Sequence, residues 1–251
     1  MRLLIFKPSF NLFLIFTLLT LLSQTSYGQE KKTSPTRETK VQFGVKVGMG
    51  ISELMTSGSP TTIVDGNTQT MRYFPVTTFT GGAFVSILLG GKWSLQPELV
   101  YSLQGATGKP EQNYYVTATE AYRLGYLNIP VLVKYKLPLA FFVETGPQLG
   151  LLLSAKDNET LVGSTSSVNY NIKSQLKSTD LSWALGVGYC SPFNIGFDVR
   201  YNLGLGNINQ ATSGSTTAPI PAGTLKNSVF QLGVFYIFGK KLFNPPPPPE
   251  I

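Results

Sequence analysis

The stretch Lys92-Trp-Ser-Leu-Gln-Pro-Glu-Leu-Val-Tyr-Ser-Leu-Gln104 alternates apolar and polar side chains almost without interruption. Taken in steps of two, its apolar face consists of Trp93, Leu95, Pro97, Leu99, Tyr101 and Leu103. A period of two is that of a β-strand, whose successive side chains point to opposite faces. The stretch is longer than the ~5–6 residues of an ordinary soluble strand and is long enough to cross a bilayer at a tilt.

The same alternation recurs along the chain, for example in Val41–Ser52, Phe141–Leu153 and Phe193–Leu205. We predict eight strands, at residues 41–52, 75–89, 92–105, 121–137, 139–154, 178–191, 193–205 and 227–239. Their apolar face is large and aromatic, whereas the opposite face is small and rich in glycine. Bulky apolar side chains suit contact with lipid, and small ones suit the interior of a narrow barrel.

The connections between these strands alternate in length. Residues 53–74, 106–120, 155–177 and 206–226 are long and polar, and tight turns at Gly90-Gly91, Leu137-Pro138 and Ser191-Pro192 separate them. Short turns on one side and long loops on the other are typical of outer-membrane barrels. The sequence therefore predicts an all-β fold, an eight-stranded antiparallel transmembrane up-and-down β-barrel at residues 41–239.

The N-terminus has the pattern of a cleaved signal peptide. Arg2 and Lys7 precede the apolar core Phe10–Leu22, and Ser26 and Gly28 occupy the −3 and −1 positions of a cleavage site. We expect residues 1–28 to be this signal, 29–40 a periplasmic tail and 240–251 a Pro-rich C-terminal tail. An even strand number places both termini in the periplasm of a Gram-negative cell.

Composition excludes several kinds of chemistry. Charged residues make up 13% of the 251 residues, below the ~25% of soluble domains. The chain has no histidine and one cysteine, Cys190, so histidine-dependent catalysis and histidine zinc sites are excluded. Its net charge of +7 accompanies no nucleic-acid-binding motif. We expect no enzymatic activity, no catalytic, cofactor-binding or metal-binding residues, no cofactor and no nucleic-acid partner.

Charged side chains on the small-residue face form the one candidate site. By strand parity, the side chains expected to point into the lumen are those of Lys46, Glu98, Lys134, Lys136, Glu144, Asp198 and Arg200. The simpler interpretation is a salt-bridged plug, because small barrels are usually filled by side chains. An ion-conducting path or a proton relay remains an alternative. Nothing in the spacing of Glu98 and Glu144 supports an acid/base pair.

Five segments resemble the PorT-family outer-membrane β-barrel domain of Bacteroidota. The most specific is Tyr126-Leu-Asn-Ile-Pro-Val-Leu-Val-Lys-Tyr-Lys136, and the others are Gly44–Gly48, Phe142–Gly150, Phe197–Tyr201 and Phe230–Val234. The resemblance covers most of residues 41–239 and implies an eight-stranded barrel in the outer membrane. The founding member is tied to a secretion machinery, and the resemblance carries over no catalytic residue.

Two functions follow as hypotheses. The first is a non-enzymatic structural or partner-interaction protein in outer-membrane lipid, acting with other envelope proteins as a subunit of an envelope or secretion assembly. The alternative is a narrow channel or transporter for small solutes. A lumen filled with bulky side chains favours the first, and an unobstructed charged lumen favours the second.

Overall fold

The computed structural model describes residues 41–57, 61–64, 67–110, 118–161, 167–210 and 224–238. The expected signal peptide at 1–28 and the expected tails at 29–40 and 240–251 lie outside the described residues.

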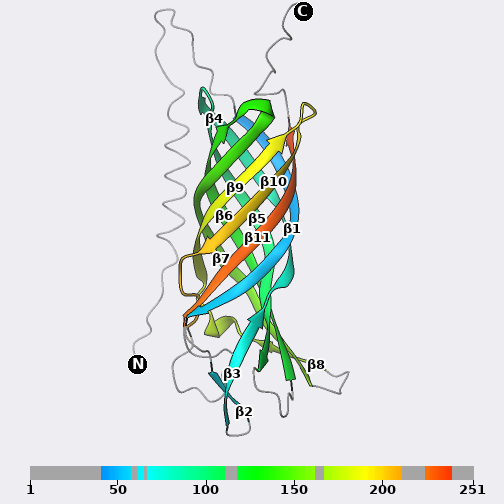
Figure 1. Ribbon diagram of the computed structural model, residues 1–251, viewed down its shortest axis with the longest axis vertical. Coiled ribbons are helices and arrows are strands. Elements are labelled where there is room, and N and C mark those ends of the chain that lie inside the picture. The colour runs from blue at the N-terminus through cyan, green and yellow to red at the C-terminus, as the bar shows by residue number, and fades with distance from the viewer. Residues whose placement is uncertain are drawn as a thin grey trace, which may run out of the picture. The chain divides into compact units, whose positions relative to one another are not determined.

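Eight antiparallel strands form a closed ring (Figure 1). In chain order they are β1 Val41–Ser57, β4 Val76–Gly90, β5 Trp93–Pro110, β6 Ala118–Lys136, β7 Phe141–Leu161, β9 Thr179–Cys190, β10 Ile195–Gly204 and β11 Thr224–Phe238. The ring closes because β1 pairs with β4 on one side and with β11 on the other. This confirms the predicted eight-stranded antiparallel barrel.

The short elements all belong to the connections. Strands β2 (Thr61–Val64) and β3 (Asn67–Phe74) form a hairpin, and β3 pairs with β5. Strand β8 (Ser167–Asn171) lies in the connection from β7 to β9 and pairs with β7. The single-turn 3₁₀ helix η2 (Pro138–Ala140) lies between β6 and β7, and η3 (Lys173–Gln175) follows β8 in the β7–β9 connection. Among the described residues, no helix has both the length and the apolar character needed to cross a membrane.

The connections alternate as predicted. Gly90-Gly91 joins β4 to β5, η2 joins β6 to β7, and Ser191–Asn194 joins β9 to β10. Both Gly90 and Gly91 have positive φ angles, of 123° and 60°, which favour glycine in this turn. We call this the turn end of the barrel, and the opposite end, which carries the longer connections with β2, β3 and β8, the loop end (Figure 1).

The strands are longer at the loop end than the sequence predicts. Residues 53–57, 106–110, 118–120 and 155–161, expected in loops, continue β1, β5, β6 and β7. Their backbone hydrogen bonding needs only a neighbouring strand, so pairing continues where the apolar outer face has ended. The expected loop 53–74 also contains β2 and β3. Only Pro75 lies between β3 and β4, and both of these strands pair with β5.

The barrel turns its apolar residues outward. Phe43, Val47 and Phe197 expose 60%, 64% and 56% of their surfaces, while most of the alternate residues of the same strands are buried. A soluble barrel has the reverse arrangement, with its apolar face inward. The exposed apolar wall is therefore a surface for lipid, as the sequence predicted.

Aromatic side chains gather at two levels of this wall. At the turn end the ring centroids of Trp93 and Tyr135 are 4.6 Å apart, and those of Phe141 and Tyr189 are 5.3 Å apart. The second level consists of Tyr101, Trp183, Tyr201 and Phe230. From Trp93 to Tyr101 along a tilted strand is roughly 20 Å, comparable with the apolar band of an outer-membrane barrel.

Candidate functional site

An ion-pair network occupies the middle of the lumen, and Arg200 lies at its centre. The Arg200 Nη1 and Nη2 groups donate to the two carboxylate oxygens of Glu98 over 2.8 and 2.9 Å. Its Nε donates to Oε1 of Glu144 over 2.7 Å. Arg200 is fully buried, so the guanidinium depends on these two carboxylates to replace water.

Two lysines complete the network. Lys46 Nζ lies 3.2 Å from Asp198 Oδ2 and 3.7 Å from Glu98 Oε2, and Lys134 Nζ lies 2.9 Å from Glu144 Oε2. All six side chains are buried. Three cations thus face three carboxylates, and the network has no net formal charge.

Glycines on neighbouring strands make room for these charges. Gly186 of β9 pairs with both Glu144 and Arg200, and a Cβ atom on it would lie 2.9 Å from Glu144 Cγ. Gly233 of β11 pairs with Asp198, and a Cβ atom there would lie 2.7 Å from a carboxylate oxygen. The small-residue face of the sequence is therefore the space into which the charged side chains pack.

The structure brings six of the seven predicted lumen charges together and leaves one apart. Lys136 is the last residue of β6, is half-buried, and lies at the turn end outside the ion-pair network. Parity alone placed it on the correct face. It did not locate the end of the strand, where the lumen opens.

Three phenylalanines fill the lumen on the turn side of the network. The ring centroid of Phe235 lies 5.9 Å from that of Phe84 and 6.0 Å from that of Phe142. Cys190 and Ile237 pack against these rings. Lys134 Nζ lies 4.2 Å from the Phe142 ring centroid, which joins this aromatic layer to the ion pairs.

Each of these rings lies over a glycine of an adjacent strand. The cross-strand partners are Gly44 for Phe84, Gly188 for Phe142 and Gly196 for Phe235. A Cβ atom on any of the three glycines would lie within 2.3 Å of the ring. Sequence reasoning missed this layer, although the signal was present in phenylalanines that share the parity of the lumen-facing charges.

Amide and hydroxyl side chains fill the lumen on the loop side of the network. Asn128 Nδ2 donates to Ser102 Oγ over 2.9 Å, and Gln148 Nε2 donates to Ser182 Oγ over 3.0 Å. Ser52 Oγ donates to the backbone carbonyl of Gly105 over 3.0 Å. These side chains bond to one another and to the backbone, as buried polar groups usually do.

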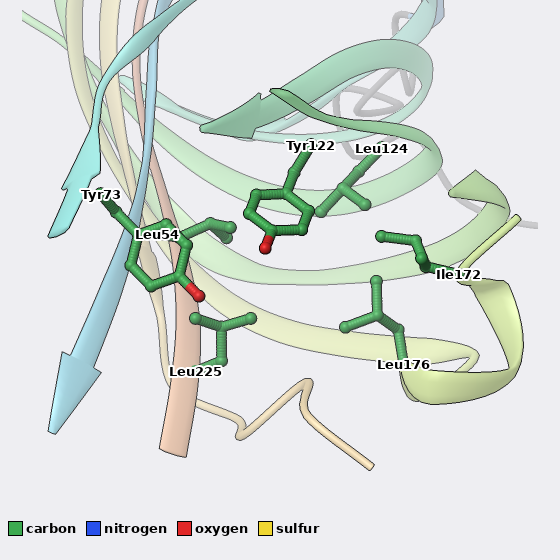
Figure 2. A pocket seen from close by; sticks show the side chains of 7 residues that line it. All are labelled: Leu54, Tyr73, Tyr122, Leu124, Ile172, Leu176 and Leu225. Atoms are coloured by element: carbon green, nitrogen blue, oxygen red, sulfur yellow. The ribbon is translucent and has the colours of Figure 1, made fainter. Parts of the chain in front are cut away.

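An apolar layer closes the loop end (Figure 2). Ile172 and Leu176, which flank η3 in the β7–β9 connection, point toward wall residues such as Tyr122 and Leu124. The gap between these side chains, which Leu54, Tyr73 and Leu225 also line, has a volume of about 10 Å³. That is space for about one water molecule. Aromatic, ionic, polar and apolar layers of buried side chains therefore follow one another along the lumen from the turn end to the loop end.

Within the described residues, no group of three or more His, Cys, Asp or Glu side chains is arranged to hold a metal ion. Glu98 and Glu144 are both engaged by Arg200, so each carboxylate neutralises buried positive charge. The arrangement stabilises a packed interior.

The family follows from the sequence match. The model of the outer membrane protein beta-barrel domain matches residues 7–210, which is most of the chain. The chain belongs to the outer membrane protein beta-barrel domain family. Membership supports location in the outer membrane, where the apolar wall of the barrel meets lipid.

Several solved structures are similar to this chain over most of their own length. Neisserial surface protein A is 14% identical with a TM-score of 0.45, over 78% of this chain and 97% of that one. The attachment invasion locus protein Ail of Yersinia pestis is 11% identical with a TM-score of 0.41, over 78% and 98%. OprG of Pseudomonas aeruginosa is 12% identical with a TM-score of 0.42, over 80% and 98%. No curated protein sequence matches the chain significantly.

Proposed function

We propose that this protein is a closed, non-enzymatic barrel with a structural or partner-interaction role in the outer membrane. The observation that carries the proposal is the filled lumen, in which the Arg200 network lies between the Phe84–Phe142–Phe235 layer and the apolar layer of the loop end. A barrel packed along its whole length is a rigid membrane scaffold, and its function then lies on its outer surfaces.

The loop end offers surfaces for a partner. Strands β5, β6 and β7 extend beyond the apolar wall, and the β2–β3 hairpin and β8 widen the sheet there. Within the described residues, β2 and β8 each pair with one strand only, so each presents an edge. Strand edges are surfaces to which a segment of another protein adds by backbone hydrogen bonds.

The proposal extends to orientation and assembly. Short turns are periplasmic and long loops external in outer-membrane barrels, so the turn end and both termini face the periplasm. This orientation agrees with the expected signal peptide at residues 1–28. The PorT-like segments, such as Tyr126–Lys136, support a role as a subunit of an envelope or secretion assembly. A narrow channel is the competing function, and the packed lumen disfavours it.

A tagged protein recovered from gently solubilised outer membranes tests the partner role. We expect other envelope proteins to be recovered with it at a fixed molar ratio, measured by quantitative mass spectrometry and repeated with the tag on the partner. Replacing Thr61–Thr70, which contains β2 and the start of β3, by a Gly-Ser linker is expected to lower that ratio. The hairpin lies outside the eight-stranded ring, so the barrel itself should still form.

Two controls accompany this experiment. Heat-dependent gel mobility of the linker variant reports whether the barrel remains folded. Recovery of the unaltered protein alone, without any envelope protein at a fixed ratio, would contradict the partner role.

A further inference from the structure

Two pairs of cations lie across neighbouring strands at the loop end. Arg72 of β3 is the cross-strand partner of Lys109 of β5, and Arg123 of β6 is the partner of Lys156 of β7. All four side chains are exposed on the outer face of the barrel wall. Like charges placed directly opposite each other destabilise a sheet, so both pairs need an explanation.

An aromatic ring holds the first pair together. The guanidinium carbon of Arg72 lies 5.5 Å from the centroid of the Phe74 ring, and Lys109 Nζ lies 5.6 Å from the same centroid. Cation–π attraction therefore holds two positive groups beside one ring, where they repel each other. The two positive charges together attract an anion to this part of the wall.

Among the side chains that the structure describes, no carboxylate forms an ion pair with either of the two cation pairs. The ion pairs found there involve none of Arg72, Lys109, Arg123 and Lys156. Asp157, next to Lys156 in sequence, is buried on the lumen side. The described part of the wall thus presents four exposed cations that form no ion pair with a described carboxylate.

The height of this surface on the wall indicates the source of the anion. A Cβ atom on Gly125 would lie 3.0 Å from the hydroxyl of Tyr101, which belongs to the second aromatic level. Arg123 is the next outward residue of β6, so it lies about 7 Å beyond Gly125 along the strand. Aromatic residues at this level mark the membrane interface, where lipid headgroups begin.

We propose that Arg72, Lys109, Arg123 and Lys156 bind the phosphate groups of phosphorylated glycolipids in the surrounding outer leaflet. The inference rests on the proposed orientation, in which the loop end faces outward. On β5, Gly105 is the cross-strand partner of Arg123, and Lys109 is the cross-strand partner of Arg72. The distance along β5 from Gly105 to Lys109 separates the two cation pairs by about 13 Å. One phosphate cannot bridge that distance, so each pair takes a phosphate of its own.

The test measures retention of lipid A by the full-length barrel in detergent micelles, with native mass spectrometry counting bound lipid. Bis-phosphorylated lipid A is compared with its dephosphorylated form. We expect the phosphorylated form to bind, and R123Q/K156Q and R72Q/K109Q each to weaken binding about tenfold, since each removes two charge-assisted contacts. Higher salt should also weaken binding, because the contacts are electrostatic.

The matched control is K177Q/K226Q, which removes two positive charges at the same end from residues that are not cross-strand partners. It should bind lipid A as the unaltered protein does. Equal retention of dephosphorylated lipid A, or an equal loss in the control variant, would overturn the proposal.

Two further probes separate the lipid from other anions. Binding of inorganic phosphate alone, with no retention of lipid A, would contradict a lipid source. Binding of a sulfated glycan without retention of lipid A would assign the surface to an external polyanion and also overturn the proposal. Either of these results would overturn lipid binding without affecting the proposed partner role, because the ratio of co-purified envelope proteins is measured independently.

Discussion

Replacing Arg200 by methionine is expected to destabilise the folded barrel by about 3–5 kcal/mol. The change leaves Glu98 and Glu144 buried without the guanidinium that now bonds to both over 2.7–2.9 Å. An uncompensated buried carboxylate costs far more than the lost attraction alone. The measurement is a urea titration of the protein in lipid vesicles, with the folded fraction read from heat-dependent gel mobility.

A second variant separates loss of charge balance from loss of packing. In R200M/E98Q, Lys134 remains with Glu144 and Lys46 remains with Asp198, so the buried charges again balance. We expect the double variant to be more stable than R200M. The exposed K92Q should change little, since the surface charge of Lys92 makes no ion pair in the described structure. A cost of R200M below about 1 kcal/mol would contradict this account of the lumen.

Replacing Gly188 by valine is expected to cost about 3 kcal/mol or to prevent folding. A Cβ atom at Gly188 would lie 2.3 Å from Cζ of Phe142 and 2.6 Å from the backbone oxygen of Phe197. The ring is held by the aromatic layer, and the backbone oxygen belongs to the neighbouring strand. Neither atom can move away without disturbing the barrel wall.

The matched control is G81V, on the outer face of β4. At Gly81 a Cβ atom would approach nothing closer than the Lys46 carbonyl oxygen, at 4.0 Å. Valine suits a strand and faces lipid there, so G81V should fold as well as the unaltered protein. Equal loss of folded protein in G188V and G81V would show that the aromatic layer does not set the requirement for glycine.

The barrel could be predicted from the sequence because one signal repeats in every strand. In Lys92–Gln104, the period of two separates the lipid face from the lumen face, and the long and short connections then fix the strand order. Parity also brought Glu98, Glu144 and Arg200 to one face. It could not pair them, because cross-strand register depends on turn geometry and on bulges such as that between Gly125 and Tyr126.

The filling of the two ends could not be predicted in the same way. The Phe84–Phe142–Phe235 layer depends on which phenylalanine lies over which glycine, and the cross-strand register decides this. The apolar layer of the loop end depends on Ile172 and Leu176, which lie in a connection that alternation does not describe. Their inward packing is set by tertiary contact with Tyr122 and Leu124.

The cation pairs Arg72–Lys109 and Arg123–Lys156 show the same limit on the outer wall. In the sequence these residues are far apart, and three of them, Arg72, Lys109 and Lys156, lie in predicted loops. Only the continuation of β5 to Pro110 and its pairing with β3 place Lys109 beside Arg72. The cation pairs therefore depend on strand extensions at the loop end, and the alternation in the sequence predicts these strands too short.

Conductance across a planar lipid bilayer tests the central claim, the closed lumen, most directly. The purified barrel is inserted and the current is recorded at both voltage signs in molar potassium chloride. A lumen filled by the Arg200 network and by the layers at both ends predicts insertion without unitary current steps. Stable, reproducible steps from the unaltered protein would contradict the closed lumen and favour a channel for small solutes.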